Sequence, residues 1–124
     1  MSVGGDRKLL GRWGEDLVAR DLRSRGCTIL AADWHCRWGE IDLIASDGKY
    51  LRIVEVKLRK NADFAQAREA VDHRKQDKLR AAAGYYLTGH PTSLQPRFDV
   101  AEVYAPEGMA TREPRINYIE NAFQ

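Results

Sequence analysis

The sequence predicts an α/β fold in which a mixed central β-sheet is flanked by helices, with elements in the order α-β-β-β-α-β. Two stretches repeat apolar residues at helical spacing, and short runs rich in isoleucine, leucine and valine lie between and after them. The chain has 124 residues, of which 44% are hydrophobic and 31% are charged, as expected for a globular protein. We therefore assign residues 1–124 to a single domain.

The N-terminal part predicts a helix followed by a short strand. Apolar residues recur every three to four positions over residues 7–25, and Gly26 is typical of the residue that ends such a helix. Residues 27–30 form a short run with β propensity. Residues 32–39, which include two tryptophans, predict an irregular segment.

The middle of the chain predicts a β-hairpin. Residues 40–45 and 50–57 are both rich in isoleucine, leucine and valine. Asp47 and Gly48, which lie between them, are typical of a tight hairpin turn. We therefore expect these two strands to pair in an antiparallel manner.

The C-terminal half predicts a second helix and the remaining strands. Residues 64–87 repeat apolar positions at helical spacing, and Gly89 and Pro91 indicate the loop that follows. Residues 98–104 predict a fourth strand, and residues 116–123 predict a last strand or a short helix.

The net charge of +2 is distributed unevenly along the chain. Residues 59–80 carry seven lysines and arginines against four acidic residues, whereas residues 81–124 carry three against five. A basic segment in a nearly neutral chain favours a polyanionic partner such as nucleic acid.

Composition also disfavours several classes of protein. No apolar run is long enough to span a bilayer, so we expect no membrane attachment. The first residues lead into no apolar signal core, which favours the cytoplasm. Cys27 and Cys36 are expected to be reduced in that compartment, and they lack the spacing of a zinc site.

Two carboxylates interrupt the apolar strands of the predicted hairpin. Asp42 lies in the first strand and Glu55 in the second, and Lys57 shares the face of Glu55. The hairpin allows these three side chains to converge. Two partly buried carboxylates repel each other unless they are protonated or bound to a cation, and Mg²⁺ or Mn²⁺ would supply that cation through oxygen ligands. In the alternative interpretation, Glu55 and Lys57 form a solvated ion pair and Asp42 caps a loop.

Several linked motifs resemble one group of nucleases. Asp42 followed by Glu55-Val56-Lys57 is similar to the PD-(D/E)xK pattern of restriction-endonuclease-like enzymes, with Ile41 at the position of the proline. From about residue 11 to residue 103, the chain more closely resembles the YraN-like family of small predicted bacterial endonucleases. The stretches that carry this resemblance are Gly14-Glu15, Gly39-Glu40-Ile41-Asp42-Leu43-Ile44, Val54-Glu55-Val56-Lys57 with Arg59, Ala70-Val71 with Lys75, and Arg97-Phe98-Asp99-Val100.

The resemblance implies a restriction-endonuclease-like fold, similar to that of Holliday-junction resolvases, and a role for each matching residue. Asp42 and Glu55 would be metal ligands, and Lys57 would be the catalytic lysine. Glu15 would correspond to the acidic catalytic residue on the first helix of the resolvase-like nucleases. Without the resemblance, Glu15 would be read as surface charge beside Asp16.

Basic residues near this site are candidates for contacts with nucleic-acid phosphates. Lys75 and Lys78 share one helix face, and Arg68 lies seven residues before Lys75 on the same side. Arg59 and Lys60 follow shortly after the proposed catalytic lysine. Such contacts position a nucleic acid without reading its sequence. An ordinary solvated face is the alternative for the helical residues.

The aromatic segment lies directly before the acidic strand. Trp34 and Trp38 are placed to stack on unpaired bases, with core packing as the alternative for at least one of them. Glu40 is expected at the rim of the site.

Together these observations predict a metal-dependent nuclease that hydrolyses phosphodiester bonds of DNA, including branched or structured DNA, with Mg²⁺ or Mn²⁺ as cofactor. DNA is favoured over RNA, and a homodimer would supply two cutting centres. One alternative is a non-catalytic nucleic-acid-binding module on the same fold, and another is an interaction protein with acidic surface strands. Cleavage that requires Mg²⁺ separates the first function from the other two, and DNA binding in EDTA separates the second from the third.

Overall fold

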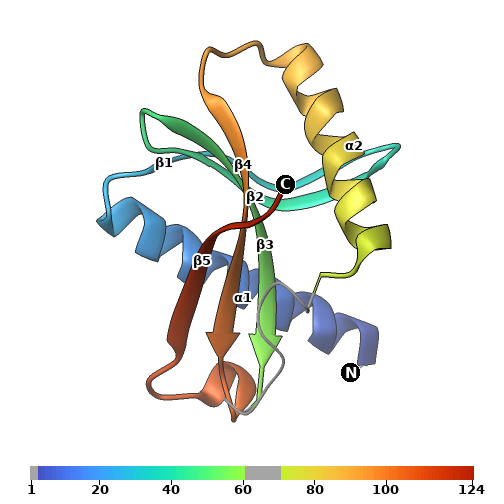
Figure 1. Cartoon of the computed structure of the whole chain (residues 1–124). Coiled ribbons are helices and arrows are strands. Elements are labelled where there is room, and N and C mark those ends of the chain that lie inside the picture. The colour runs from blue at the N-terminus through green and yellow to red at the C-terminus, as the bar shows by residue number, and fades with distance from the viewer. Residues whose placement is uncertain (1–2, 61–70) are drawn as a thin grey trace.

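The computed structural model describes residues 3–60 and 71–124, and Figure 1 shows a twisted β-sheet with two helices packed on it. The sequence order of the described elements is α-β-β-β-α-β-β, with one short 3₁₀ helix before the last strand. They are α1 (Val3–Ser24), β1 (Thr28–Cys36), β2 (Gly39–Ser46), β3 (Tyr50–Arg59), α2 (His73–Gly89), β4 (Gln95–Tyr104), η2 (Gly108–Ala110) and β5 (Arg115–Phe123). The mixed sheet and its flanking helices confirm the predicted α/β fold class.

The sheet has the strand order β1-β2-β3-β4-β5. Neighbouring strands pair antiparallel, except that β3 and β4 run parallel. Parallel neighbours require a crossover connection, and α2 lies on it. The predicted hairpin is confirmed, because Ser46 pairs with Leu51 across the turn between β2 and β3.

The first strand is longer than predicted. Residues 32–36 were expected to be irregular, but they continue β1, with Ala32 opposite Leu43 and Trp34 opposite Ile41 of β2. The exposed polar side chains on this edge strand obscured its alternation in the sequence. The last segment, 115–123, is also a strand, because it pairs with β4 along most of its length.

The second helix begins later than predicted. Within the described residues, Asp72 is the N-cap of α2, and its side chain accepts a hydrogen bond from the Lys75 backbone N–H at 2.9 Å. The helix therefore starts at His73. The predicted start at residue 64 lies outside the described residues.

The hydrophobic core has two parts, one against each helix. One part joins Val18 and Leu22 of α1 to buried sheet residues such as Val54. The other joins Leu79 and Ala82 of α2 to residues that include Ile44, Ile53 and Val100. Burying these side chains supplies the main stabilisation of the sheet and fixes both helices on it. Among residues 3–60 and 71–124, no helix combines the length and apolar character needed to cross a bilayer.

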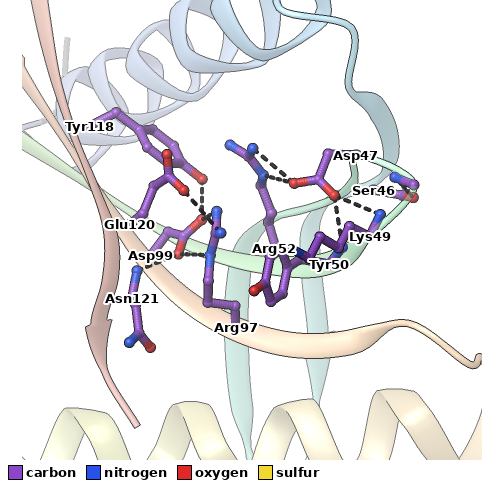
Figure 2. Close-up of polar contacts among 11 residues, drawn as sticks. Ser46, Asp47, Lys49, Tyr50, Arg52, Arg97, Asp99, Tyr118, Glu120 and Asn121 are labelled. Carbon is purple, nitrogen blue, oxygen red and sulfur yellow. Dashed lines mark hydrogen bonds and ion pairs between the residues drawn. The ribbon is translucent and has the colours of Figure 1, made fainter.

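The buried carboxylate of Asp99 on β4 links this strand to β5, as Figure 2 shows. Asp99 is 0% exposed, and Arg97 donates to its two carboxylate oxygens at 2.8 and 3.0 Å. The Tyr118 hydroxyl and the Asn121 backbone N–H donate to the same carboxylate at 2.6 and 2.9 Å. A buried charge with so many partners has a structural role.

A second polar cluster in Figure 2 stabilises the turn between β2 and β3. Asp47 accepts hydrogen bonds from the backbone N–H groups of Lys49 and Tyr50 at 2.8 and 2.7 Å, and its other oxygen pairs with Arg52. Burial acts to raise the pKa of Asp47, but these hydrogen bonds prevail and lower it to about 2. The turn thereby sets the register of the hairpin that carries the candidate site.

Candidate functional site

Asp42 lies where β2 separates from β3. The ladder between these strands runs from Ser46 opposite Leu51 to Leu43 opposite Val54. Beyond it, the Asp42 carboxylate accepts a hydrogen bond from the Val56 backbone N–H at 2.8 Å. The side chain thus replaces a strand partner at the fork between β2 and β3.

The change in packing along β2 explains this separation. Side chains two positions apart share a face on a regular strand. Ile41, however, belongs to the core against α2, whereas Leu43 belongs to the core against α1. The strand must therefore twist at Asp42, which opens the ladder there and leaves Asp42 half-buried between elements.

Glu55 is the buried centre of a charged cluster on β3. The residue is only 5% exposed. The ammonium of Lys57, two positions further along the strand, lies 3.8 Å from Glu55 Oε1. Lys75, in the first turn of α2, lies 3.7 Å from the same oxygen. Both helix and strand therefore bring positive charge to this one carboxylate.

Burial and neighbouring negative charges raise the pKa of both Glu55 and Asp42. Burial, followed by the negative charge of Asp42, raises the pKa of Glu55 to about 7, although the two lysines oppose this. Burial also raises the pKa of Asp42, against the effect of its hydrogen bond from Val56. A carboxyl pair with raised pKa values retains protons that a divalent cation would displace.

Glu15 reaches the same cluster from α1. Gly14 makes this approach possible, because a Cβ atom there would lie only 3.1 Å from Leu58 of β3. Burial, and then the charges of Asp42 and Asp33, raise the pKa of Glu15 to about 8. A side-chain hydrogen bond with Asp42 also favours the protonated form of Glu15. The structure thus brings together all four predicted catalytic residues.

A pocket of about 490 Å³ opens over this cluster. Its lining includes the acidic residues Glu15 and Asp42 and the basic residues Arg7, Lys8 and Arg12 of α1. A pocket lined by both acidic and basic residues suits a cation and a phosphate bound next to each other. The sequence did not predict that the basic residues of α1 lie at the site, because nothing in their local spacing links them to the acidic strands.

Three further polar residues lie at the mouth of this pocket. His35 contacts Asp33 at 2.9 Å through Nε2 and Glu40 at 3.4 Å through Nδ1. All three residues are exposed, which agrees with the expected rim position of Glu40. Asp33 and His35 were missed because their segment was read as irregular. An extended β1 would have placed them on one face.

The predicted phosphate contacts fall into different surroundings. Lys75 and Lys78 lie along a second pocket beside the acidic cluster. Lys60 is exposed at the end of β3. Arg68 lies outside the described residues, so the structure places no contact for it.

Arg59 takes part in a polar network at the far end of β4. It donates to the carboxylate of Glu102 at 3.2 Å, and Tyr104 and Asn117 donate to the other Glu102 oxygen at 3.2 and 3.1 Å. Glu102 is only 2% exposed. Arg59 therefore helps to hold three strands together, and its contact with a phosphate stays a prediction.

The chain matches relatives along almost its entire length. The model of the uncharacterised protein family UPF0102 matches residues 14–103. A UPF0102 protein of Pelotomaculum thermopropionicum is 44% identical over 119 residues, which cover 94% of this chain and 97% of that relative. One from Frankia casuarinae is 43% identical and covers 92% of this chain and 95% of the relative. One from Acidothermus cellulolyticus is 38% identical, with 94% and 95% covered.

Proposed function

The chain belongs to the uncharacterised protein family UPF0102, as its YraN-like motifs predicted, and we propose that it is a metal-dependent nuclease that hydrolyses phosphodiester bonds of DNA. The observation that carries the proposal is the half-buried Asp42 beside the buried Glu55, with two lysine ammonium groups within 4 Å of Glu55. Buried acids beside paired cations, in an open pocket, are typical of a site that binds both a metal and a phosphate.

The donor set fits a hard divalent cation. Asp42 and Glu55 offer carboxylate oxygens. Burial raises the pKa of both, the charge of Asp42 raises that of Glu55 further, and a bound cation would favour their ionised forms. When bound, Mg²⁺ or Mn²⁺ would polarise the phosphoryl group and lower the pKa of the attacking water. The backbone N–H of Val56 fixes the Asp42 carboxylate in its orientation.

The lysines and Glu15 supply the remaining chemistry. The Lys57 ammonium would orient the nucleophile or offset negative charge that develops on the phosphate. Lys75 would hold a substrate phosphate next to the same carboxylate. Glu15, with its pKa raised to about 8, holds a proton near neutral pH and would exchange it with Asp42 or with water.

This function carries expectations about partners and location. Contacts with phosphates should dominate binding, so sequence specificity should be low. Branched or structured DNA, a homodimer with two cutting centres and a cytoplasmic location remain parts of the proposal.

The test is cleavage of plasmid, flapped and four-way DNA with and without Mg²⁺. Wild type should cut, EDTA should stop it, and Asp42→Asn should be inactive, whereas Asp16→Asn, which changes an exposed acid on α1, should cut like wild type. Wild type that cuts none of these substrates, nor RNA, contradicts the proposal. Equal cutting by wild type and Asp42→Asn shows that the assigned site is wrong.

A non-catalytic nucleic-acid-binding module is the second candidate function. The observation in its favour is that Lys57 and Lys75 already offset the charge of Glu55. Such a module would bind DNA equally well in Mg²⁺ and in EDTA and would cut nothing.

A further inference from the structure

A second pocket adjoins the acidic cluster. It has a volume of about 470 Å³ and lies between the tip of the hairpin formed by β1 and β2 and the N-terminal half of α2. His35 and Glu40 line both pockets, so the two are neighbours. Lys75 lines this second pocket and also contacts Glu55. A ligand in the second pocket would therefore lie beside the proposed catalytic carboxylates.

The hairpin tip holds Trp38 in place on this pocket. Cys36 pairs with Gly39 to close the tip. Gly39 has a φ of +152°, and a Cβ atom there would lie 3.6 Å from the carbonyl oxygen of Lys78 in α2. The φ value favours glycine at this position, and the tip lies in van der Waals range of the helix. The position of Trp38 is set by backbone packing on both sides of the pocket.

Trp38 differs from the other tryptophan of the hairpin. Trp34 packs edge-on against Tyr86, with ring centroids 5.4 Å apart, so its role is in the core. Trp38 is 51% exposed. The guanidinium of Arg37 lies 5.0 Å from the Trp38 ring centroid. A large exposed aromatic beside a cation is a stacking surface for a planar ligand.

The charge of the pocket indicates what that ligand is. Among the described residues that line it, Arg37, Lys75 and Lys78 are cationic and Glu40 is anionic. A planar group joined to a phosphate matches both the tryptophan and the lysines. A nucleotide has both parts, whereas a base inside a duplex is stacked on its neighbours and presents no free face.

We propose that this second pocket binds an unpaired nucleotide, with its base stacked on Trp38 and its phosphate held by Lys75 and Lys78. The inference rests on the proposed function for the identity of the ligand as DNA, and it names the substrate class. That class is DNA with a single-stranded segment next to the cleaved bond, as in flaps, forks and frayed ends. Because every base has a stacking face, the pocket accepts any sequence.

The test measures binding in EDTA, so that cleavage plays no part. The probes are an oligothymidine of about 12 nucleotides and a duplex of the same length, with tryptophan fluorescence and anisotropy as readouts. Stacking on one aromatic is worth about 5- to 100-fold in affinity. Trp38→Ala should lose that factor for the oligothymidine and stay within about twofold of wild type for the duplex, since duplex binding depends on phosphate contacts.

Two matched variants sharpen this result. Trp38→Phe keeps a stacking ring, so it should retain most of the affinity while it loses the fluorescence quenching. Tyr85 is an aromatic residue of α2 that is 52% exposed and lies outside the lining of this pocket. The variant Tyr85→Ala should therefore bind oligothymidine like wild type. Equal oligothymidine binding by wild type and Trp38→Ala overturns the proposal, as does equal loss in Trp38→Ala and Trp38→Phe. Wild type that binds no oligothymidine also overturns it.

The same experiment separates this inference from the nuclease proposal. If the protein binds oligothymidine through Trp38 but cuts no DNA in Mg²⁺, the nucleotide pocket stands and the nuclease proposal is contradicted. If the protein cuts DNA but Trp38→Ala keeps full single-strand affinity, the nuclease proposal stands and the nucleotide pocket is contradicted.

Discussion

Lys75 of α2 holds its ammonium 3.7 Å from the buried carboxylate of Glu55 on β3. The two residues lie twenty positions apart in sequence, and the crossover between the parallel strands β3 and β4 brings them together. From its helical spacing, Lys75 is predicted to be one of a row of phosphate contacts. Its position gives it a further effect, because its positive charge lowers the pKa of Glu55. A phosphate held by Lys75 would therefore be electrostatically linked to the acidic cluster.

The first prediction concerns this row of lysines. Replacing both Lys75 and Lys78 with alanine should weaken DNA binding similarly for all sequences. It should also reduce the slope of log affinity against log salt by about 1.8, since each phosphate contact on duplex DNA contributes about 0.9. Salt titrations of binding in EDTA measure the slope.

Arg74→Ala is the control for that slope. Arg74 is an exposed cation of the same helix and lines neither described pocket. Its removal should leave the slope within about 0.3 of wild type. If the Arg74 and the double-lysine variants change the slope alike, the lysines form an ordinary solvated face.

The second prediction is that the metal-free protein loses stability as pH rises from about 4.5 to 8. The folded-state pKa values of Glu55 and Glu15 are about 7 and 8, against ordinary values of 4.5. Across this window the folded protein binds more protons than the unfolded chain, so the free energy of unfolding falls with pH. Urea unfolding in EDTA at a series of pH values measures the trend.

Glu15→Gln should make that fall smaller, because an amide does not titrate and removes one of the repelling carboxyls. Asp16→Asn, an exposed neighbour on α1, should follow the wild-type curve. Saturating Mg²⁺ should restore stability at pH 8, where the carboxylates are ionised. A wild-type stability that stays constant or rises from pH 5 to pH 8 contradicts these raised pKa values.

The predictable parts of the structure were those that depend on local chemistry. The turn at Asp47 and Gly48 was recognisable because its side-chain hydrogen bonds and positive φ lie within a few residues. Strand alternation then places Glu55 and Lys57 on one face of β3. The approach of Glu15 depends on the packing of α1 through Gly14, so only the family resemblance indicated it.

The surroundings of residues whose partners lie far away in sequence could not be predicted from local patterns. Arg59 was assigned to phosphate contacts because it follows Lys57, yet it pairs with Glu102, which is 43 residues away. Asp33 was missed because an edge strand with exposed polar side chains lacks a clear apolar alternation. In both cases, strand pairing decided the surroundings of the side chain.

The third prediction tests the structural role assigned to Asp99. Asp99→Asn removes the buried ion pair of the Arg97 guanidinium, at a site where the aspartate is 0% exposed. Breaking one partner of a buried pair costs about 3–5 kcal/mol, so the free energy of unfolding should fall by an amount of that order. Glu120 also pairs with Arg97, at 2.9 Å, but its side chain is 59% exposed. Glu120→Gln should cost less than about 1 kcal/mol in the same urea titration, and an equal loss in both variants contradicts the assignment.

The last prediction distinguishes the residues that hold the metal from the residue that acts on the phosphate. Asp42→Asn and Glu55→Gln keep the shape of each side chain but remove the charge that binds a divalent ion. Mn²⁺ titrations followed by calorimetry should therefore show binding by wild type and strongly weakened binding by both variants.

Lys57→Ala removes a cation that repels the metal and is not a ligand, so its Mn²⁺ affinity should equal or exceed that of wild type. Its cleavage rate should nevertheless fall by about 100-fold or more, as expected when a charge that stabilises the transition state is lost. Lys49→Ala, which removes an exposed cation in the turn between β2 and β3, is the matched control and should retain metal binding and nearly all cleavage. If Lys57→Ala loses Mn²⁺ binding together with cleavage, the lysine supports the site structurally. If Asp42→Asn binds Mn²⁺ as tightly as wild type, the fork between β2 and β3 is not the metal site.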